Sequence, residues 1–145
     1  MPGGKGSTYD NDLLKLLFQA TPIANIADNA ASSPLTSLYF SLHTADPGAG
    51  GAQTTSEAAY TSYARVAVAR TSSGFTVSGN SCILASPINF PTPSGGAGEI
   101  ELFFAVGTAL SGAGKILYHG PITPSISILV GTAPQLTTGT TITES

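Results

Sequence analysis

The chain has 145 residues, of which 41% are hydrophobic and only 9% are charged, and its formal net charge is −3. Five basic residues without a cluster exclude the electrostatic footprint of nucleic-acid binding. No apolar run reaches the roughly 20 residues that span a bilayer, so no membrane contact is expected. The N-terminal MPGGKGSTYDND lacks the apolar core of a signal peptide, and the single Cys82 excludes an internal disulfide. We therefore expect synthesis in a reducing cytoplasm.

One helix is predicted, near the N-terminus. Ser7 or Thr8 offers an N-cap, and Thr21-Pro22 stops the apolar pattern that follows. On a helical wheel the apolar residues cover roughly 200°, whereas a helix lying on its own domain needs about 100°. The surplus predicts a second apolar face covered by a neighbouring subunit. The alternative is a helix wedged between the sandwich and residues 22–35 of its own chain. The residues expected in partner contact are Leu13, Leu14, Leu16 and Phe18.

Alternating apolar residues and turn signals predict seven or eight short strands in the remainder of the chain. Their expected ranges are 36–43, 63–70, 75–78, 82–90, 99–106, 115–119, 125–130 and 139–144. The spacing predicts an all-β fold, an antiparallel jelly-roll-like β-sandwich of about eight short strands with one N-terminal α-helix. Residues 1–35 would form a leader, the helix and a connector, and residues 36–145 the sandwich domain.

The clearest alternation lies in residues 99–106, where Phe103 stands on the face opposite Ile100, Leu102, Phe104 and Val106. If one face of this strand packs on the core, Phe103 must meet a second layer or a neighbouring molecule. The alternative is a central strand with both faces covered. Phe103 is therefore a candidate partner-binding residue, and self-association as a dimer or trimer is expected.

Residues that could carry catalysis or bind metal are few. His43 and His119 lack a third ligand by spacing, and Asp10 and Asp12 are better explained as caps of the helix. Cys82 lies among apolar residues and is expected to be a buried, inert thiol. The sequence thus predicts no catalytic residue, no metal site and no cofactor, and a protein that is not an enzyme.

Two further patterns in the sequence are candidate binding sites. Residues 107–115 superficially resemble a phosphate-binding loop, but the lysine is misplaced and the loop joins two strands. A strip of tyrosines could stack on sugar rings, although tyrosine on a strand more often packs across to its neighbour. The tyrosines of this strip are Tyr39, Tyr60, Tyr63 and Tyr118.

The segment 37–71 resembles a family of small bacteriophage structural proteins. The resemblance rests on Ser41–Gly48, Glu57 and Tyr63–Val68, and residues 107–114 and 118–123 are similar too. Members of this kind are often labelled tail-fibre or virion structural proteins. The size and strand pattern also resemble capsid cement proteins, which clamp neighbouring major capsid subunits on the outside of a phage head.

This resemblance implies binding without catalysis. The leading expectation is a capsid cement or decoration protein, made in the host cytoplasm, that binds the major capsid protein on the outer surface of the head and stabilises the shell. The alternative is a tail or fibre component. A second alternative is a carbohydrate-binding β-sandwich module.

Overall fold

The computed structural model describes residues 7–23 and 34–145, which contain one helix and nine strands. The predicted leader and most of the predicted connector, residues 1–6 and 24–33, lie outside the described residues. The expected fold class is confirmed: the protein is mostly β, its strands form several antiparallel sheets, and its helix is N-terminal.

The chain divides into two compact units, each built from segments that are distant in sequence. Unit 1 comprises residues 1–36, 69–86 and 137–145, and unit 2 comprises residues 37–68 and 87–136. The strand pattern of the sequence, by contrast, predicts one sandwich domain over residues 36–145. Strand periodicity reports the local structure of a segment, but not the partner against which the segment packs.

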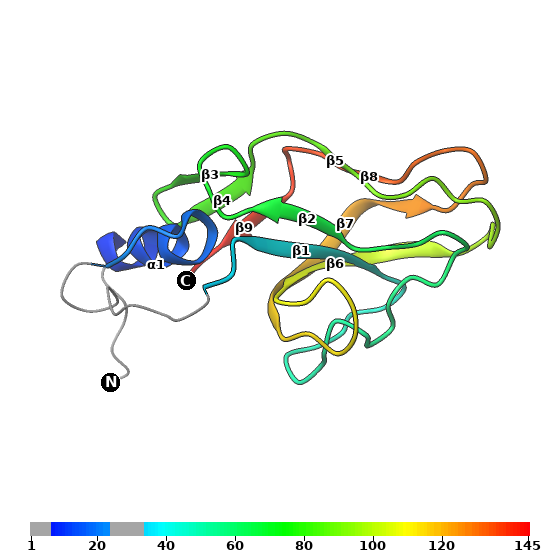
Figure 1. Ribbon diagram of the computed structural model, residues 1–145, viewed down its shortest axis with the longest axis horizontal. Helices are drawn as coiled ribbons and strands as arrows, with labels where there is room; N and C mark the ends of the chain where they lie inside the picture. The colour runs from blue at the N-terminus through cyan, green and yellow to red at the C-terminus, as the bar shows by residue number, and fades with distance from the viewer. Residues whose placement is uncertain (1–6, 24–33) are drawn as a thin grey trace. The chain divides into compact units, whose positions relative to one another are not determined.

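Unit 2 contains a four-stranded sheet in the order β2-β1-β6-β7 and a two-stranded sheet of β5 and β8 (Figure 1). The strands are β1 (Ser37–His43), β2 (Val66–Ala69), β5 (Ile88–Asn89), β6 (Ile100–Gly107), β7 (Ile116–Ser127) and β8 (Gln135–Leu136). The short strand β8 was not predicted, and the predicted strand 82–90 is divided into β4 (Ser81–Leu84) and β5, with Pro87 between them. Proline cannot donate to a ladder, which accounts for the interruption.

The core of unit 2 lies around the antiparallel pair β1 and β6, which join through residues 39–43 and 103–107. On one face, the rings of Phe40 and Phe104 stack with their centroids 6.3 Å apart. On the other face, Ser41 and Ala105 are also fully buried. Both faces are therefore covered over this half of β6, as the alternative considered for Phe103 requires. The other half differs, because Ile100 and Leu102 are 47% and 43% exposed.

Strand β7 forms one edge of the four-stranded sheet and runs unbroken through a region where two strands and a corner were predicted. Its register against β6 shifts: Phe103 lies opposite Pro121, while Glu101 lies opposite Ile126. The extra residues of β7 include Pro124 and form a bulge. An edge strand tolerates proline, since one of its sides needs no hydrogen bonds from the sheet.

A glycine sets the start of β6. Gly98 takes a φ of +99°, its N–H donates to the carbonyl of Ile128, and the N–H of Ile128 donates to the carbonyl of Glu99. Gly98 and Glu99 thus both lie opposite Ile128, and this arrangement is a G1 β-bulge. A side chain at position 98 would be strained at this φ.

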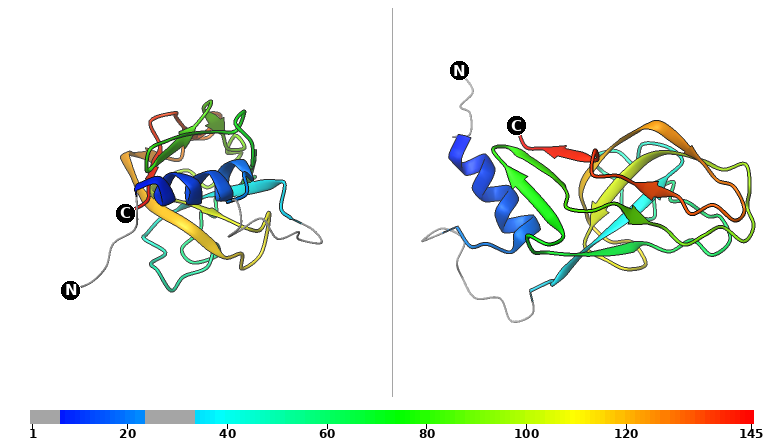
Figure 2. Two further views of the ribbon diagram at one scale, coloured as in Figure 1. Left: turned by 90° about the vertical axis from the view of Figure 1, so that its left-hand side faces the viewer. Right: turned by 90° about the horizontal axis from the view of Figure 1, so that it is seen from above.

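Unit 1 joins a three-stranded antiparallel sheet to the helix α1 (Ser7–Gln19). The sheet contains β3 (Phe75–Ser78), β4 and β9 (Thr141–Thr143), and Figure 2 shows α1 running alongside β3 and β4. Phe18 and Phe75 meet edge to face with a centroid distance of 4.8 Å. The helix ends at Gln19, where Ala20 takes a φ of +53°, which confirms the predicted stop at Thr21-Pro22.

Arg70 fixes the C-terminal end of α1. Its guanidinium donates to the carbonyls of Leu17 (2.7 Å), Leu16 (2.8 Å) and Leu35 (2.6 Å). The last carbonyls of a helix have no partner within the helix and carry partial negative charge. A cation at this position therefore satisfies two of them and also holds the chain at residue 35.

We expect Arg70→Ala to destabilise unit 1 by about 2 kcal/mol, because the helix carbonyls lose charge-assisted hydrogen bonds. The measurement is chemical denaturation followed by the helical signal in far-ultraviolet circular dichroism. The matched control is Lys15→Ala on the same helix, which should change stability by no more than about 0.5 kcal/mol. An equal loss in both variants would contradict a capping role for Arg70.

Candidate functional site

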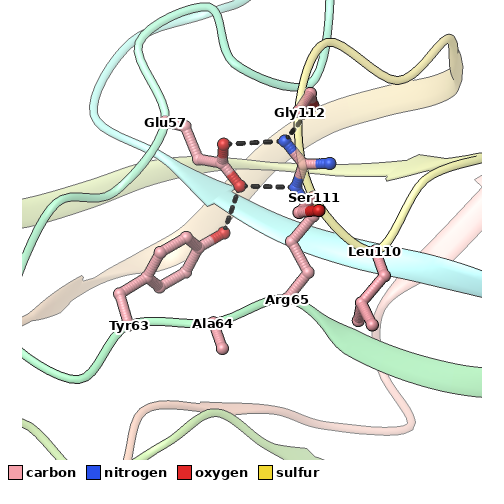
Figure 3. Close-up of a pocket in the computed structure, with 7 residues that line it drawn as sticks. All are labelled: Glu57, Tyr63, Ala64, Arg65, Leu110, Ser111 and Gly112. Atoms are coloured by element: carbon pink, nitrogen blue, oxygen red, sulfur yellow. Dashed lines mark hydrogen bonds and ion pairs between the residues drawn. The ribbon is translucent and has the colours of Figure 1, made fainter.

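The most ordered group of polar side chains in unit 2 centres on a buried ion pair (Figure 3). Arg65 donates from Nε to Oε1 of Glu57 at 2.7 Å and from Nη2 to Oε2 at 2.8 Å. The two side chains are only 3% and 15% exposed. Such a two-pronged, parallel contact is the strongest geometry for an arginine and a carboxylate.

Tyr63 completes the pair. Its hydroxyl donates to Oε1 of Glu57 at 2.9 Å and accepts the backbone N–H of Leu42, on β1, at 3.2 Å. Burial raises the pKa of Tyr63 well above its usual range, so the phenol remains a proton donor. The ring of Tyr63 also stacks on Phe90 with centroids 6.3 Å apart. The ion pair is thereby tied to both a strand and an aromatic cluster.

Arg65 also holds the loop between β6 and β7, whose residues Thr108–Gly114 we call the anchored loop. Nη1 donates to the carbonyl of Ala109 at 2.9 Å, and Nη2 donates to the carbonyl of Gly112 at 2.7 Å. The hydrogen bond from Arg65 to Glu57 raises the pKa of the guanidinium above its ordinary value. The charge therefore persists at any physiological pH.

A second buried side chain, Gln53, holds the loop from its other side. Its amide nitrogen donates to the carbonyl of Tyr39 at 3.0 Å, and its amide oxygen accepts the N–H of Ala109 at 3.1 Å. A Cβ added at Gly107 or Gly114 would lie 2.2 Å from Gln53 atoms. The glycines that give residues 107–115 their likeness to a phosphate loop thus make room for this glutamine.

A cavity of about 260 Å³ lies between the ion pair and the anchored loop. Glu57, Tyr63, Ala64, Arg65, Leu110, Ser111 and Gly112 line it, as Figure 3 shows. The polar groups at its base already bond to one another, so they are poorly placed to bind a small ion. Leu110, in contrast, is 58% exposed. The arrangement presents an apolar side chain on a rigid loop, which suits contact with another protein surface.

Ser41 and His43 have the geometry of a nucleophile beside a base, but both are fully buried. Nε2 of His43 lies 2.8 Å from the Ser41 hydroxyl, and Nδ1 lies 2.8 Å from the carbonyl of Thr55. The carbonyl can only accept, so Nδ1 carries the proton and Nε2 accepts from Ser41. Burial lowers the pKa of His43 below its ordinary value. No substrate can reach this pair in the folded structure.

The other two candidate reactive side chains, His119 and Cys82, differ in exposure. Nδ1 of His119 lies 2.9 Å from Oδ1 of Asp46 at the surface. Burial raises the pKa of the Cys82 thiol to about 12, in line with the expected inert thiol. Within residues 7–23 and 34–145, no group of three or more His, Cys, Asp or Glu side chains is placed to hold a metal ion.

The predicted partner-binding residues of the helix divide by burial. Leu14 and Phe18 have no exposed surface, because they fill the core of unit 1. Leu13 and Leu16 are half-buried, and partner contact through them stays a prediction. Phe103 is also half-buried, beside His43 on one side and Pro121 on the other, and its role likewise stays a prediction.

The tyrosines do not form the strip considered for sugar binding. Tyr60 is 2% exposed, and its ring meets that of Tyr63 edge to face at 5.3 Å. Tyr39 and Tyr118 are half-buried. Tyr60 therefore belongs to the core of unit 2, where it cannot stack on a sugar, and Tyr63 is half-buried like the other two rings.

The Arg65–Glu57 pair was not identified as a site from the sequence, although both residues lie in the segment that carries the family resemblance. The scarcity of charged residues is a feature of the sequence that could have indicated this ion pair. In a chain with five basic and eight acidic residues, an arginine within a predicted strand needs a partner if the strand is buried.

Comparison with known protein families agrees with a structural role. Residues 10–144 match the family described as "Podophage GP4 fiber I protein gp80". This family defines the class of the protein as a phage virion structural protein. The chain belongs to the Podophage GP4 fiber I protein gp80 family. A search of curated proteins gives no match. Within the described part of the chain, no helix is long and apolar enough to cross a membrane.

We expect Arg65→Met to destabilise unit 2 by about 3–5 kcal/mol, because it leaves the buried Glu57 carboxylate unpaired. The anchored loop should also become a site of rapid proteolysis. Denaturation and limited proteolysis measure the two effects. Lys115→Met, an exposed cation beside the same loop, is the control and should be nearly neutral. Equal stability of the two variants would refute the anchoring role of Arg65.

Proposed function

We propose that this protein is a structural subunit of a podophage tail fibre and that it acts by binding, without catalysis. The observation that carries the proposal is the family match over residues 10–144, since that family is described by a fibre protein. The leading expectation from the sequence was a cement protein on the head, with the fibre as its alternative. The family description favours the fibre, while contact with the major capsid protein stays a prediction.

The architecture of unit 2 is compatible with such a role. The anchored loop is held by Arg65 and Gln53, so Leu110 is presented with little conformational freedom left to lose. A surface ordered before binding loses less entropy when its partner docks. The burial of Tyr60 withdraws one of the four candidate rings from the surface, which counts against the carbohydrate-binding alternative.

The location of the protein on the particle tests the fibre proposal. We expect antibodies against the chain to label the tail of purified phage, and quantitative mass spectrometry to find far fewer copies than of the major capsid protein. An antibody against the major capsid protein is the control for access to the head. Uniform labelling of the head, with a copy number comparable to that of the major capsid protein, would favour the hypothesis of a cement protein instead.

We also propose that copies of the chain associate through the end of β6 that extends beyond β1. Here Ile100 and Leu102 are exposed; Ile100 pairs with Ser127 of β7, and Leu102 lies at the register shift between Glu101 and Phe103. Among the strands of residues 7–23 and 34–145, β7 pairs with β6 alone, and no Asp, Glu, Lys or Arg occurs in residues 116–143. Natural edge strands usually carry charge that keeps a second copy away. Without such charge, two identical edges can approach without repulsion.

We expect the double variant Ile100→Ser and Leu102→Ser to weaken self-association without unfolding the protein, because both side chains are already partly in water. Sedimentation velocity over a range of concentrations measures the association. Leu35→Ser, which removes an exposed leucine from unit 1, is the matched control. A wild-type protein that stays monomeric at high concentration would contradict the proposal, as would equal weakening in the control.

A further inference from the structure

Glu101 is a buried acid whose polar neighbour is another carboxyl group, that of Glu99. It lies in β6, its side chain has no exposed surface, and neither carboxyl oxygen has a hydrogen-bond partner among the described residues. An ionised carboxylate in such a place lacks both water and a compensating donor, which is strongly unfavourable. The neighbour opposite Glu101 on β7 is Ile126, whose side chain offers no hydrogen bond.

The titratable groups that face Glu101 are themselves acids. Glu99 lies two residues earlier, on the same face of the chain, and its Oε1 accepts the N–H of Ala59 at 2.8 Å. Tyr60, in the neighbouring residues 58–61 that we call the covering segment, donates its hydroxyl to the carbonyl of Pro91 at 2.9 Å. Burial, followed by the influence of Glu99, raises the pKa of Glu101 to about 8. Burial, then Glu101 and Glu99, raises the pKa of Tyr60 to about 12.

The covering segment, residues 58–61, is held by individual hydrogen bonds and not by a strand ladder. Besides the bond from Ala59 to Glu99, Thr61 exchanges backbone hydrogen bonds with Gly95 (3.1 Å) and Ser94 (3.2 Å). The N–H of Ala58 donates to Leu42 at 2.8 Å. The segment belongs to no regular strand, so it can separate from β6 without breaking the main sheet.

We propose that Glu101 is a neutral carboxylic acid in the folded protein, and that loss of its proton opens the covering segment away from β6. The ionised group must reach water, and repulsion from Glu99 acts in the same direction. The covering segment lies outside the strands and is bonded directly to Glu99 through the N–H of Ala59, so repulsion between the two carboxylates acts on that bond. Unit 2 would therefore carry a local, pH-dependent opening, independent of whether the protein serves in a fibre or on a head.

The sign of the effect follows from linkage. The pKa of Glu101 is about 8 in the folded protein and 4.5 in the unfolded chain, so the folded state binds the proton more tightly. Its contribution to stability is full below 4.5 and is lost as the pH rises towards about 8. His43 acts in the opposite sense. Burial lowers its pKa, so the stability it contributes is present above 6.5 and is lost as the pH falls.

The variant Glu101→Gln isolates the effect, because glutamine has nearly the same size and cannot ionise. Between about pH 5 and about pH 8, the folding equilibrium constant of the wild type should fall relative to that of the variant on the order of 100-fold. Denaturant titrations at each pH measure this ratio. Glu144→Gln, in unit 1, is the control and should keep the wild-type pH dependence. Identical pH dependence of Glu101→Gln and the wild type would overturn the proposal.

Hydrogen exchange tests the opening itself. At about pH 8, the amides of Ala59 and Thr61 should lose protection in the wild type but not in Glu101→Gln. The amide of Phe90, which donates to Pro134 at 2.8 Å elsewhere in unit 2, should remain protected in both proteins. If Ala59 and Thr61 stay as protected as Phe90, the segment does not open and the proposal fails.

Two further measurements keep the proposal testable if the variant does not fold. The NMR shift of the wild-type Glu101 carboxyl carbon should change with a midpoint near pH 8, and a midpoint near 4.5 would overturn the proposal. Excess Ca²⁺ should leave that midpoint unchanged. If Ca²⁺ instead abolishes the titration and stabilises the protein, the two carboxyl groups bind a cation in place of a proton, and the proposal is wrong.

Discussion

The buried pair of Arg65 and Glu57 determines how the polar parts of unit 2 are arranged. Removing both charges from water is costly, and the cost is offset only when every remaining donor and acceptor finds a partner. Tyr63 bonds to the carboxylate, and the carbonyls of Ala109 and Gly112 bond to the guanidinium. Satisfying one ion pair therefore fixes an aromatic side chain, a strand contact and the conformation of a surface loop.

The same chemistry recurs in unit 1, where Arg70 binds the carbonyls of Leu16, Leu17 and Leu35. In both units an arginine donates to main-chain carbonyls of residues that are distant from the arginine in sequence. Arginine suits this task because its planar guanidinium offers five donors and keeps its charge when buried. A chain with few charges thus places two of them where loops and helix ends need partners. The surface is left with little charge, and such a surface suits lasting protein contacts.

Membership of the fibre family and the geometry of unit 2 support the same kind of role. The side chains that look reactive, Ser41, His43 and Cys82, are buried. In unit 2 the exposed large apolar side chains lie on β6, on the anchored loop and at residues 129–130. A fibre subunit needs stable contacts with its neighbours and loops of fixed shape. The acid at Glu101 adds a feature of a different kind, a group whose protonation state can change the stability of one end of the sheet.

The sequence by itself determined the all-β class, the single helix with its end at Thr21-Pro22, and most of the strands, because these depend on local periodicity and turn chemistry. It did not determine which faces are covered. Alternation placed Ile100 and Leu102 opposite Glu101, yet the acid is the buried member and the two apolar residues are exposed. The same holds for the apolar helix, where tertiary contacts buried Leu14 and Phe18 and left Leu13 and Leu16 half-buried. Periodicity tells which residues share a face, but burial depends on contacts between distant segments. Only the tertiary structure decides those contacts.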